Sequence, residues 1–282
     1  MSQPPVTTAI ALSGGANLGP MHAGAVVALL EAGLQPDLLV GTSVGAMNAA
    51  YLATRPGLAS ARELGEAWAN LRRRDAFRFS LGGAIAGFLA ARDHLVSPSR
   101  LAALMRQWVT VERIEDAPVR FAAVATDALS GEPVVLDRGP VVPALMASSA
   151  IPGLLPAVRH LGRWLIDGTL SASCPALQAQ DLGADVVYVV TTRTAPRVRP
   201  PRGALAMAMN SVSLLTARAA AEQLATARRR AEASGGTVLE VPTGEPPAPG
   251  PFDFNQARFL FARSYAEASS WCRDNLGSRA TQ

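Results

Sequence analysis

The stretch V-G-T-S-V-G-A-M-N-A-A, residues Val40–Ala50, decides the fold prediction. It follows a short apolar run and leads into small residues that suit a closely packed helix. A G-x-S-x-G turn between strand and helix is the pattern of a nucleophile elbow, in which the serine stands at a helix amino terminus. Gly41 and Gly45 would then let the strand and the helix approach each other. Two interpretations stay open at this point: Ser43 is a nucleophile, or it is a serine between two packing glycines.

The residues before this stretch predict an α/β domain. Thr8–Leu12 is an apolar strand, Ser13–Leu18 a glycine-bearing loop, and Gly19–Ala32 a helix that ends before Gly33. A second strand, Leu38–Val40, enters the Gly-Thr-Ser-Val-Gly turn. This β-loop-α-β-turn-α order indicates that the first two strands are parallel neighbours in one sheet.

Apolar runs and turn residues predict the remaining elements. Helices are expected at Leu58–Leu71, from Pro98 to Trp108 with Ser97 as the N-cap, at Ala144–Ala150, Ala204–Ala233 and Gln256–Leu276. Strands are expected at Arg120–Ala125, Pro133–Leu136, Arg163–Ile166, Asp185–Thr191 and Thr237–Val241.

Composition restricts the class of protein and its partners. The chain is 49% hydrophobic and 17% charged, which is typical of a globular protein. All 26 basic residues are arginine and the net charge is +4. The arginines are expected to be solvated, with a weak attraction to anionic lipid surfaces as the alternative. No aromatic residues interleave with the short clusters Arg72–Arg74 and Arg228–Arg230, so no nucleic-acid partner is predicted.

The termini and the cysteines predict a cytoplasmic location. Met1–Thr8 lacks the basic start and apolar centre of a signal peptide, and no apolar run is long enough to cross a membrane. Cys174 and Cys272 are far apart in the chain and are expected to be buried free thiols. Peripheral association with a membrane remains compatible with these features.

A nucleophilic serine needs a base, and the histidines are poor candidates. None of His22, His94 and His160 follows a strand with an acid placed to orient it, and His160 is expected in a turn. Asp167 follows an apolar run instead, at the end of a predicted strand. Partial burial there would raise its proton affinity and make it a better base for Ser43. The alternative is that Asp167 only caps the strand in an Asx-turn.

The loop S-G-G-A-N-L-G, residues 13–19, is the candidate anion site. Successive glycines at a helix start let backbone N–H groups converge on negative charge. A P-loop is excluded because Gly19 is followed by proline and methionine rather than lysine and serine or threonine. A dinucleotide-binding loop is excluded because Ala16 occupies the position of a required glycine.

These blocks, in this order, resemble the patatin-like phospholipases. Residues 13–19 resemble the oxyanion loop of that family, 41–45 its nucleophile elbow, and 167–169 (D-G-T) its Asp-Gly-Gly/Ala block. Residues 125–132 and 147–153 resemble the segments that lie between these motifs in the family. The resemblance implies a three-layer α/β/α fold with a mostly parallel central sheet. The resemblance covers residues 8–192, which would form the catalytic core. Residues 193–282 show no such match, and their expected helix, strand and helix would complete the same domain.

The resemblance also implies a chemistry. The family's activity is hydrolysis of acyl esters of lipids through an acyl-enzyme, with a Ser–Asp dyad that would here be Ser43 and Asp167. The backbone N–H groups of Gly14, Gly15 and Ala16 would form the oxyanion hole. No cofactor and no metal are implied, and the partners would be a lipid or acyl-ester substrate and, transiently, a membrane surface.

Three positions differ from the family pattern. Ala16 replaces a glycine, and a positive φ there would cost about 1 kcal/mol. Leu18 stands where a basic residue is frequent, and Thr169 where glycine or alanine is usual. Two other functions are therefore kept as alternatives: acyl transfer from the same acyl-enzyme, and non-catalytic lipid binding. Phe77–Ala91, an apolar segment between arginines, is interpreted either as a mobile cover at the lipid interface or as a buried core helix.

Overall fold

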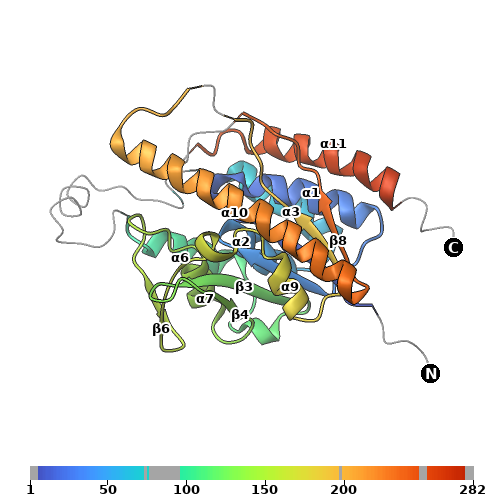
Figure 1. Ribbon diagram of the computed structural model, residues 1–282, viewed down its shortest axis with the longest axis horizontal. Helices are drawn as coiled ribbons and strands as arrows, with labels where there is room; N and C mark the ends of the chain where they lie inside the picture. The colour runs from blue at the N-terminus through green and yellow to red at the C-terminus, as the bar shows by residue number, and fades with distance from the viewer. Residues whose placement is uncertain (1–5, 73–74, 76–95, 197–198, 248–252, 277–282) are drawn as a thin grey trace.

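A computed structural model describes residues 6–72, 75, 96–196, 199–247 and 253–276, and its centre is an eight-stranded sheet (Figure 1). The strand order is β5-β6-β3-β2-β1-β7-β8, and β4 pairs with β3 away from this path. The strands are β1 (Thr8–Leu12), β2 (Leu38–Thr42), β3 (Arg120–Asp127), β4 (Pro133–Leu136), β5 (Val158–His160), β6 (Arg163–Asp167), β7 (Val186–Val190) and β8 (Thr237–Val241).

The sheet is mostly parallel, as the sequence predicts. β1 pairs in parallel with β2 and β7, and the same direction continues to β3 and β8. β4 and β6 run antiparallel to β3, and β5 runs antiparallel to β6. The carboxyl ends of β1, β2 and β3 therefore lie side by side, while Asp167 returns to this edge on the antiparallel strand β6.

Alternating side chains of the strands bury two separate cores. Ile10 and Leu12 of β1 face one cluster, whereas Ala9 and Ala11 face the other. Helices cover both faces, so the fold is the predicted three-layer α/β/α arrangement (Figure 1). One layer holds α1 (Gly19–Glu31), α2 (Val44–Thr54), α3 (Leu58–Asn70), α6 (Ser99–Trp108), α7 (Val141–Ser148) and α11 (Ala257–Asn275); the other holds α8 (Thr169–Ala172), α9 (Ala176–Asp181) and α10 (Ala204–Ser234).

Residues after 192 extend this architecture. β8 pairs with β7 along its whole length, and α10 and α11 cover opposite faces of the sheet. Ser264 of α11 donates a buried hydrogen bond of 2.6 Å from Oγ to the carbonyl of Met21 in α1. These contacts join the described residues after 192 to the sheet and helices formed by the residues before them; that residues 193–282 complete one domain with residues 8–192 stays a prediction.

The structure corrects three local predictions. The predicted turn at His160 is strand β5, because Val158–His160 pairs with β6. Ser97 does not cap α6: Pro98 occupies the N-cap, and the Ser97 hydroxyl lies 2.9 Å from that of Ser99. Helix α7 begins at Val141 rather than Ala144, because a proline at its third residue is tolerated in a first helical turn.

The segment Phe77–Ala91 and His94 lie outside the described residues. Within the described part of the chain, no helix combines the length and the apolar character needed to cross a bilayer.

Candidate active site

The turn at Ser43 has the strained geometry that the glycines imply. β2 ends at Thr42, α2 begins at Val44, and Ser43 between them has φ 54° and ψ −121°. A Cβ added to Gly41 would overlap the backbone of Gly45, and one added to Gly45 would overlap the carbonyl of Leu12. The first strand and the two ends of the turn are thus in direct backbone contact, which larger residues would prevent.

Ser43 and Asp167 meet at this edge of the sheet although 124 positions separate them. The Ser43 hydroxyl donates a hydrogen bond of 2.7 Å to Asp167 Oδ2, and the two residues are 5% and 3% exposed. The other carboxylate oxygen, Oδ1, accepts the backbone N–H of Thr169 at 2.8 Å. Asp167 therefore makes the Asx-turn and also faces the serine, so the two interpretations of this residue describe different oxygens of one carboxylate.

Burial sets the proton affinity of this carboxylate. Removal from water raises the pKa of Asp167, and the hydrogen bonds from Thr169 and Ser43 oppose that shift without cancelling it. A carboxylate of this kind accepts a proton more readily than a solvated aspartate does. The electrostatics therefore suit an acceptor for the Ser43 proton.

Ser148, at the end of α7, is hydrogen-bonded to Ser43 and to Gly168, the residue after Asp167. Its Oγ accepts the N–H of Ser43 at 2.9 Å and donates to the carbonyl of Val124 at 2.6 Å. Its own carbonyl accepts the N–H of Gly168 at 3.2 Å. In the sequence, Ser148 stands out only as part of the segment 147–153 between the motifs. The structure shows that it is hydrogen-bonded to Ser43 in the elbow and to Gly168 after Asp167.

The glycine loop lies against the amino end of α2, since Gly45 closely approaches the carbonyls of Leu12 and Ser13. The N–H of Gly14 donates to the carbonyl of Ser173 at 3.0 Å and is therefore already engaged. Among the hydrogen bonds of the described residues, none uses the N–H of Gly15 or Ala16. Ala16 has φ 49°, so the strain expected at this position is present.

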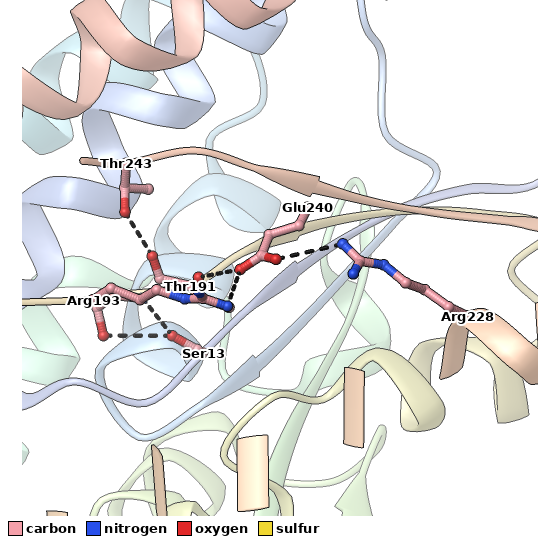
Figure 2. A network of polar contacts seen from close by, with 7 residues as sticks. Ser13, Thr191, Arg193, Arg228, Glu240 and Thr243 are labelled. Atoms are coloured by element: carbon pink, nitrogen blue, oxygen red, sulfur yellow. Dashed lines mark hydrogen bonds and ion pairs between the residues drawn. The ribbon is translucent and has the colours of Figure 1, made fainter. Parts of the chain in front are cut away.

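Hydrogen bonds join the glycine loop, residues 13–19, to the residues that follow β7 (Figure 2). Thr192 donates its N–H to Ser13 Oγ at 3.0 Å and its hydroxyl to the carbonyl of Gly14 at 2.7 Å. A Cβ on Gly15 would overlap the Thr192 side chain, so the two are in close contact. This packing fixes the path of the loop next to the turn.

Glu240 of β8 contacts the residues that follow β7. Its carboxylate accepts the Thr191 hydroxyl at 3.0 Å and pairs with Arg193 at 2.7 Å and with Arg228 of α10 at 3.4 Å (Figure 2). The sequence analysis did not identify Glu240. The network connects the glycine loop, through Thr191 and its neighbour, to β8 and α10.

Asn48 joins the elbow helix to the far end of the loop. Its amide nitrogen donates to the carbonyl of Gly19 at 2.9 Å, and its oxygen accepts the indole N–H of Trp68 at 2.9 Å. His22 Nδ1 lies 3.3 Å from the same amide nitrogen. Burial lowers the pKa of His22 to about 3, so this histidine is neutral at physiological pH.

Neither described histidine contacts the Ser43–Asp167 pair. His22 faces Asn48, and His160 is buried on β5 with its pKa lowered by burial. The part of the chain that the structure describes contains no group of three or more His, Cys, Asp or Glu side chains arranged to hold a metal ion.

Comparison with known proteins agrees with the fold and with the order of these motifs. Residues 10–179, more than half of the chain, match the family model of patatin-like phospholipases. The chain therefore belongs to the patatin-like phospholipase family.

Two relatives carry the name of the NTE family. One, an uncharacterized NTE family protein of Mycobacterium tuberculosis, is 34% identical over 188 residues, which cover 65% of this chain and 48% of that protein. Another, an uncharacterized NTE family protein of Mycobacterium bovis, is 31% identical over 186 residues, which cover 66% of this chain and 30% of that protein. The matched region thus spans less than half the length of these relatives.

A solved structure shares the fold. VipD from Legionella pneumophila matches with a TM-score of 0.50 at 15% identity, over 98% of this chain and 68% of that protein.

Proposed function

We propose that this protein hydrolyses acyl ester bonds of lipids, with Ser43 as nucleophile and Asp167 as base. The observation that carries the proposal is the buried hydrogen bond of 2.7 Å from Ser43 Oγ to Asp167 Oδ2. Membership of the patatin-like phospholipase family supports a lipid ester as the substrate class. The raised pKa of Asp167 supports its role as the proton acceptor.

The first step forms an acyl-enzyme. Ser43 Oγ transfers its proton to Asp167 Oδ2 and attacks the ester carbonyl carbon. The carbonyl oxygen becomes an oxyanion, which the N–H groups of Gly15 and Ala16 stabilise, each by about 3 kcal/mol. The bond to the alcohol then breaks, and Asp167 returns the proton to the leaving oxygen.

The second step releases the fatty acid. Asp167 removes a proton from water, the resulting hydroxide attacks the acyl carbon, and Ser43 leaves with that proton restored. The N–H of Gly14 has no part in this scheme because it donates to Ser173. The proposal therefore keeps two of the three amides predicted from the sequence.

Labelling with a fluorophosphonate probe tests the nucleophile. The wild type is expected to form a covalent adduct, and Ser43→Ala is expected to form none. Ser130→Ala, which changes an exposed serine in the turn after β3, is the control and should label as the wild type does. Labelling that persists in Ser43→Ala would refute the assignment.

Product analysis tests the reaction. Defined phospholipids and p-nitrophenyl esters are offered with and without an added alcohol, and free fatty acid is measured against new ester. Hydrolysis predicts fatty acid as the main product in both conditions. Ester as the main product would instead assign acyl transfer to the same acyl-enzyme.

A further inference from the structure

Helix α10 is much longer than the strands that it covers. Its 31 residues extend about 46 Å at the usual rise per residue, whereas β7 and β8 have 5 residues each, roughly 17 Å. Buried contacts with the sheet come from its second half, through Leu224, Ala227 and Ala231. The first half of α10 therefore extends past the sheet.

The edge that it passes is the one that carries Ser43. Because β7 and β8 are parallel, α10 starts at their carboxyl end and runs back to their amino end. Gln223 marks the level of the candidate site: its side chain donates to the carbonyl of Ser171 at 2.6 Å and accepts the N–H of Cys174 at 3.2 Å. The residues of α10 before Gln223 precede that level, and the first half of α10 reaches beyond β8 (Figure 1).

This projecting half is apolar where a solvated helix would be charged. No Asp, Glu, Arg or Lys occurs from residue 204 to residue 217. Met207, Val212, Leu214 and Leu215 are 42%, 47%, 65% and 69% exposed. Large apolar side chains gathered at one exposed place indicate an interaction surface rather than ordinary solvent exposure.

The strand turns at the same edge add further apolar side chains. Leu129, in the turn after β3, is 86% exposed, and Leu161 and Trp164 of the β5–β6 hairpin are 67% and 47% exposed. The N–H of Ala128 donates to the carbonyl of Trp164 at 2.8 Å, which places the turn and the hairpin together. Leu170, three residues after Asp167, is 39% exposed.

Most of the exposed large apolar residues thus lie at one edge of the molecule. Among the described residues ten such side chains are exposed. Two of them lie apart: Val6 precedes β1, and Phe259 is in the first turn of α11, in the helix layer opposite α10. The other eight, here called the edge surface, are Leu129, Leu161, Trp164, Leu170, Met207, Val212, Leu214 and Leu215.

Charge identifies the kind of partner. Residues 194–217 contain three arginines (197, 199 and 202) and no acidic residue, whereas the flanking Arg193 and Arg218 pair with Glu240 and Glu222. Arg199 and Arg202 are exposed in the loop that leads into α10. A second copy of the chain would bring these arginines against their own like charges in a two-fold contact, whereas an anionic lipid surface would attract them.

We propose that the edge surface, with Arg199 and Arg202, docks the protein on an anionic lipid bilayer and turns Ser43 toward it. Leucine, methionine and tryptophan side chains would enter the interface while the arginines contact lipid phosphates. The proposal rests on the lipid substrate proposed above, because docking gives the nucleophile access to lipid that does not leave the bilayer.

Vesicle co-sedimentation tests docking apart from catalysis. The full chain with Ser43→Ala is mixed with phosphatidylcholine vesicles with or without about 30 mol% phosphatidylglycerol, an anionic lipid. We expect binding that is strongest on the anionic vesicles. Leu214→Ser/Leu215→Ser should weaken it at least tenfold, and Arg199→Gln/Arg202→Gln roughly 25-fold at low salt, from about 1 kcal/mol per arginine.

Phe259→Ser is the matched control, since Phe259 is 50% exposed on α11 and lies outside the edge surface. It should bind vesicles as the parent does. Far-ultraviolet circular dichroism and thermal melting confirm that each variant folds. Equal binding by the double-leucine variant and the parent would overturn the proposal. So would vesicle-independent dimers that the double-leucine change abolishes, because they would assign the surface to a second copy.

Hydrolysis rates, measured with chains that retain Ser43, complete the test. The double-leucine variant should hydrolyse a soluble short-chain ester at the wild-type rate but vesicle phospholipid at least tenfold more slowly. A parallel loss on both substrates would contradict a docking role. Vesicle binding by the Ser43→Ala chain without any esterase activity of the wild type would reject the catalytic proposal and leave docking intact.

Discussion

Replacement of Ser148 by alanine tests whether the elbow depends on this side chain. The Ser148 hydroxyl is fully buried and makes two hydrogen bonds, one from the N–H of Ser43 and one to the carbonyl of Val124. Alanine removes the oxygen and leaves the rest of the residue in place. Both backbone groups would then be buried without this partner.

The structure sets the size of the effect. A buried backbone group that loses its partner costs about 1–3 kcal/mol, so two such groups give roughly 2–6 kcal/mol before any relaxation. Because strand β3 already pairs on both sides near Val124, we expect a value of about 3 kcal/mol. With a urea m value of about 3 kcal/mol/M, the unfolding midpoint would fall by about 1 M.

Ser149 supplies the matched control. It is the next residue, it is also buried, and its Oγ has no hydrogen-bond partner among the described residues. Ser149→Ala removes the equivalent hydroxyl oxygen but leaves no backbone N–H or carbonyl without its hydrogen-bond partner. Its free energy of unfolding should therefore stay within about 0.5 kcal/mol of the wild type or rise.

Urea unfolding followed by tryptophan fluorescence gives the stabilities, and fluorophosphonate labelling gives the reactivity of Ser43. A shift of the elbow by a fraction of an ångström should slow labelling of Ser148→Ala roughly ten- to hundredfold, while Ser149→Ala labels normally. Equal stability of the two variants, or full labelling of a destabilised Ser148→Ala, would refute the argument that this hydroxyl positions the nucleophile.

Four further predictions concern other buried groups. Gly14→Ala should lower the free energy of unfolding by about 1–3 kcal/mol through overpacking, because its Cβ would overlap the Thr169 side chain. The φ of Gly14 itself allows alanine. In urea unfolding, the added change Thr169→Ala should restore at least half of the lost stability. Burial raises the pKa of Asp167, so the acid limb of kcat/KM should lie above the range of a solvated aspartate. The raised pKa also means that stability is lost as pH rises through the folded-state value, so Asp167→Asn should unfold at higher urea than the wild type at pH 7, with the difference shrinking as pH falls. Burial raises the pKa of Cys174 to about 12 and that of Cys272 to about 11, so a thiol reagent at neutral pH should modify both in urea and neither in the native protein within the same time.

The sequence predicts the strand–turn–helix units well because their causes are local. A five-residue apolar strand followed by glycines and a run of small residues leaves few other conformations. β1 and β2 lie within two residues of their predicted bounds, and α2 follows the turn directly, as the elbow pattern predicts. Predictions fail where a neighbour in space decides the outcome. Val158–His160 has no strong strand pattern and becomes β5 only because β6 pairs with it.

The same division holds in the candidate site. Gly41, Gly45 and Ser43 are recognisable because their spacing along the chain expresses their geometry. Ser148 and Glu240 are not, because each acts through hydrogen bonds to residues distant along the chain: 105 positions separate Ser148 from Ser43, and 49 separate Glu240 from Thr191. A buried serine whose hydroxyl is bonded to the elbow and one whose hydroxyl has no partner among the described residues do not differ in their immediate sequence, as Ser148 and Ser149 in A-S-S-A show.

Asp167 explains why a structural and a chemical interpretation of one residue need not compete. The sequence offered a turn-capping carboxylate or a base for Ser43. The structure uses Oδ1 for the cap, and that hydrogen bond to the N–H of Thr169 fixes the carboxylate plane so that Oδ2 meets the serine hydroxyl. A freely rotating aspartate in a site this buried would lose a partner on one oxygen at a cost of about 1–3 kcal/mol. In the dyad proposed above, the cap would therefore hold Oδ2 in position to accept the proton of Ser43, and neither histidine among the described residues contacts that pair.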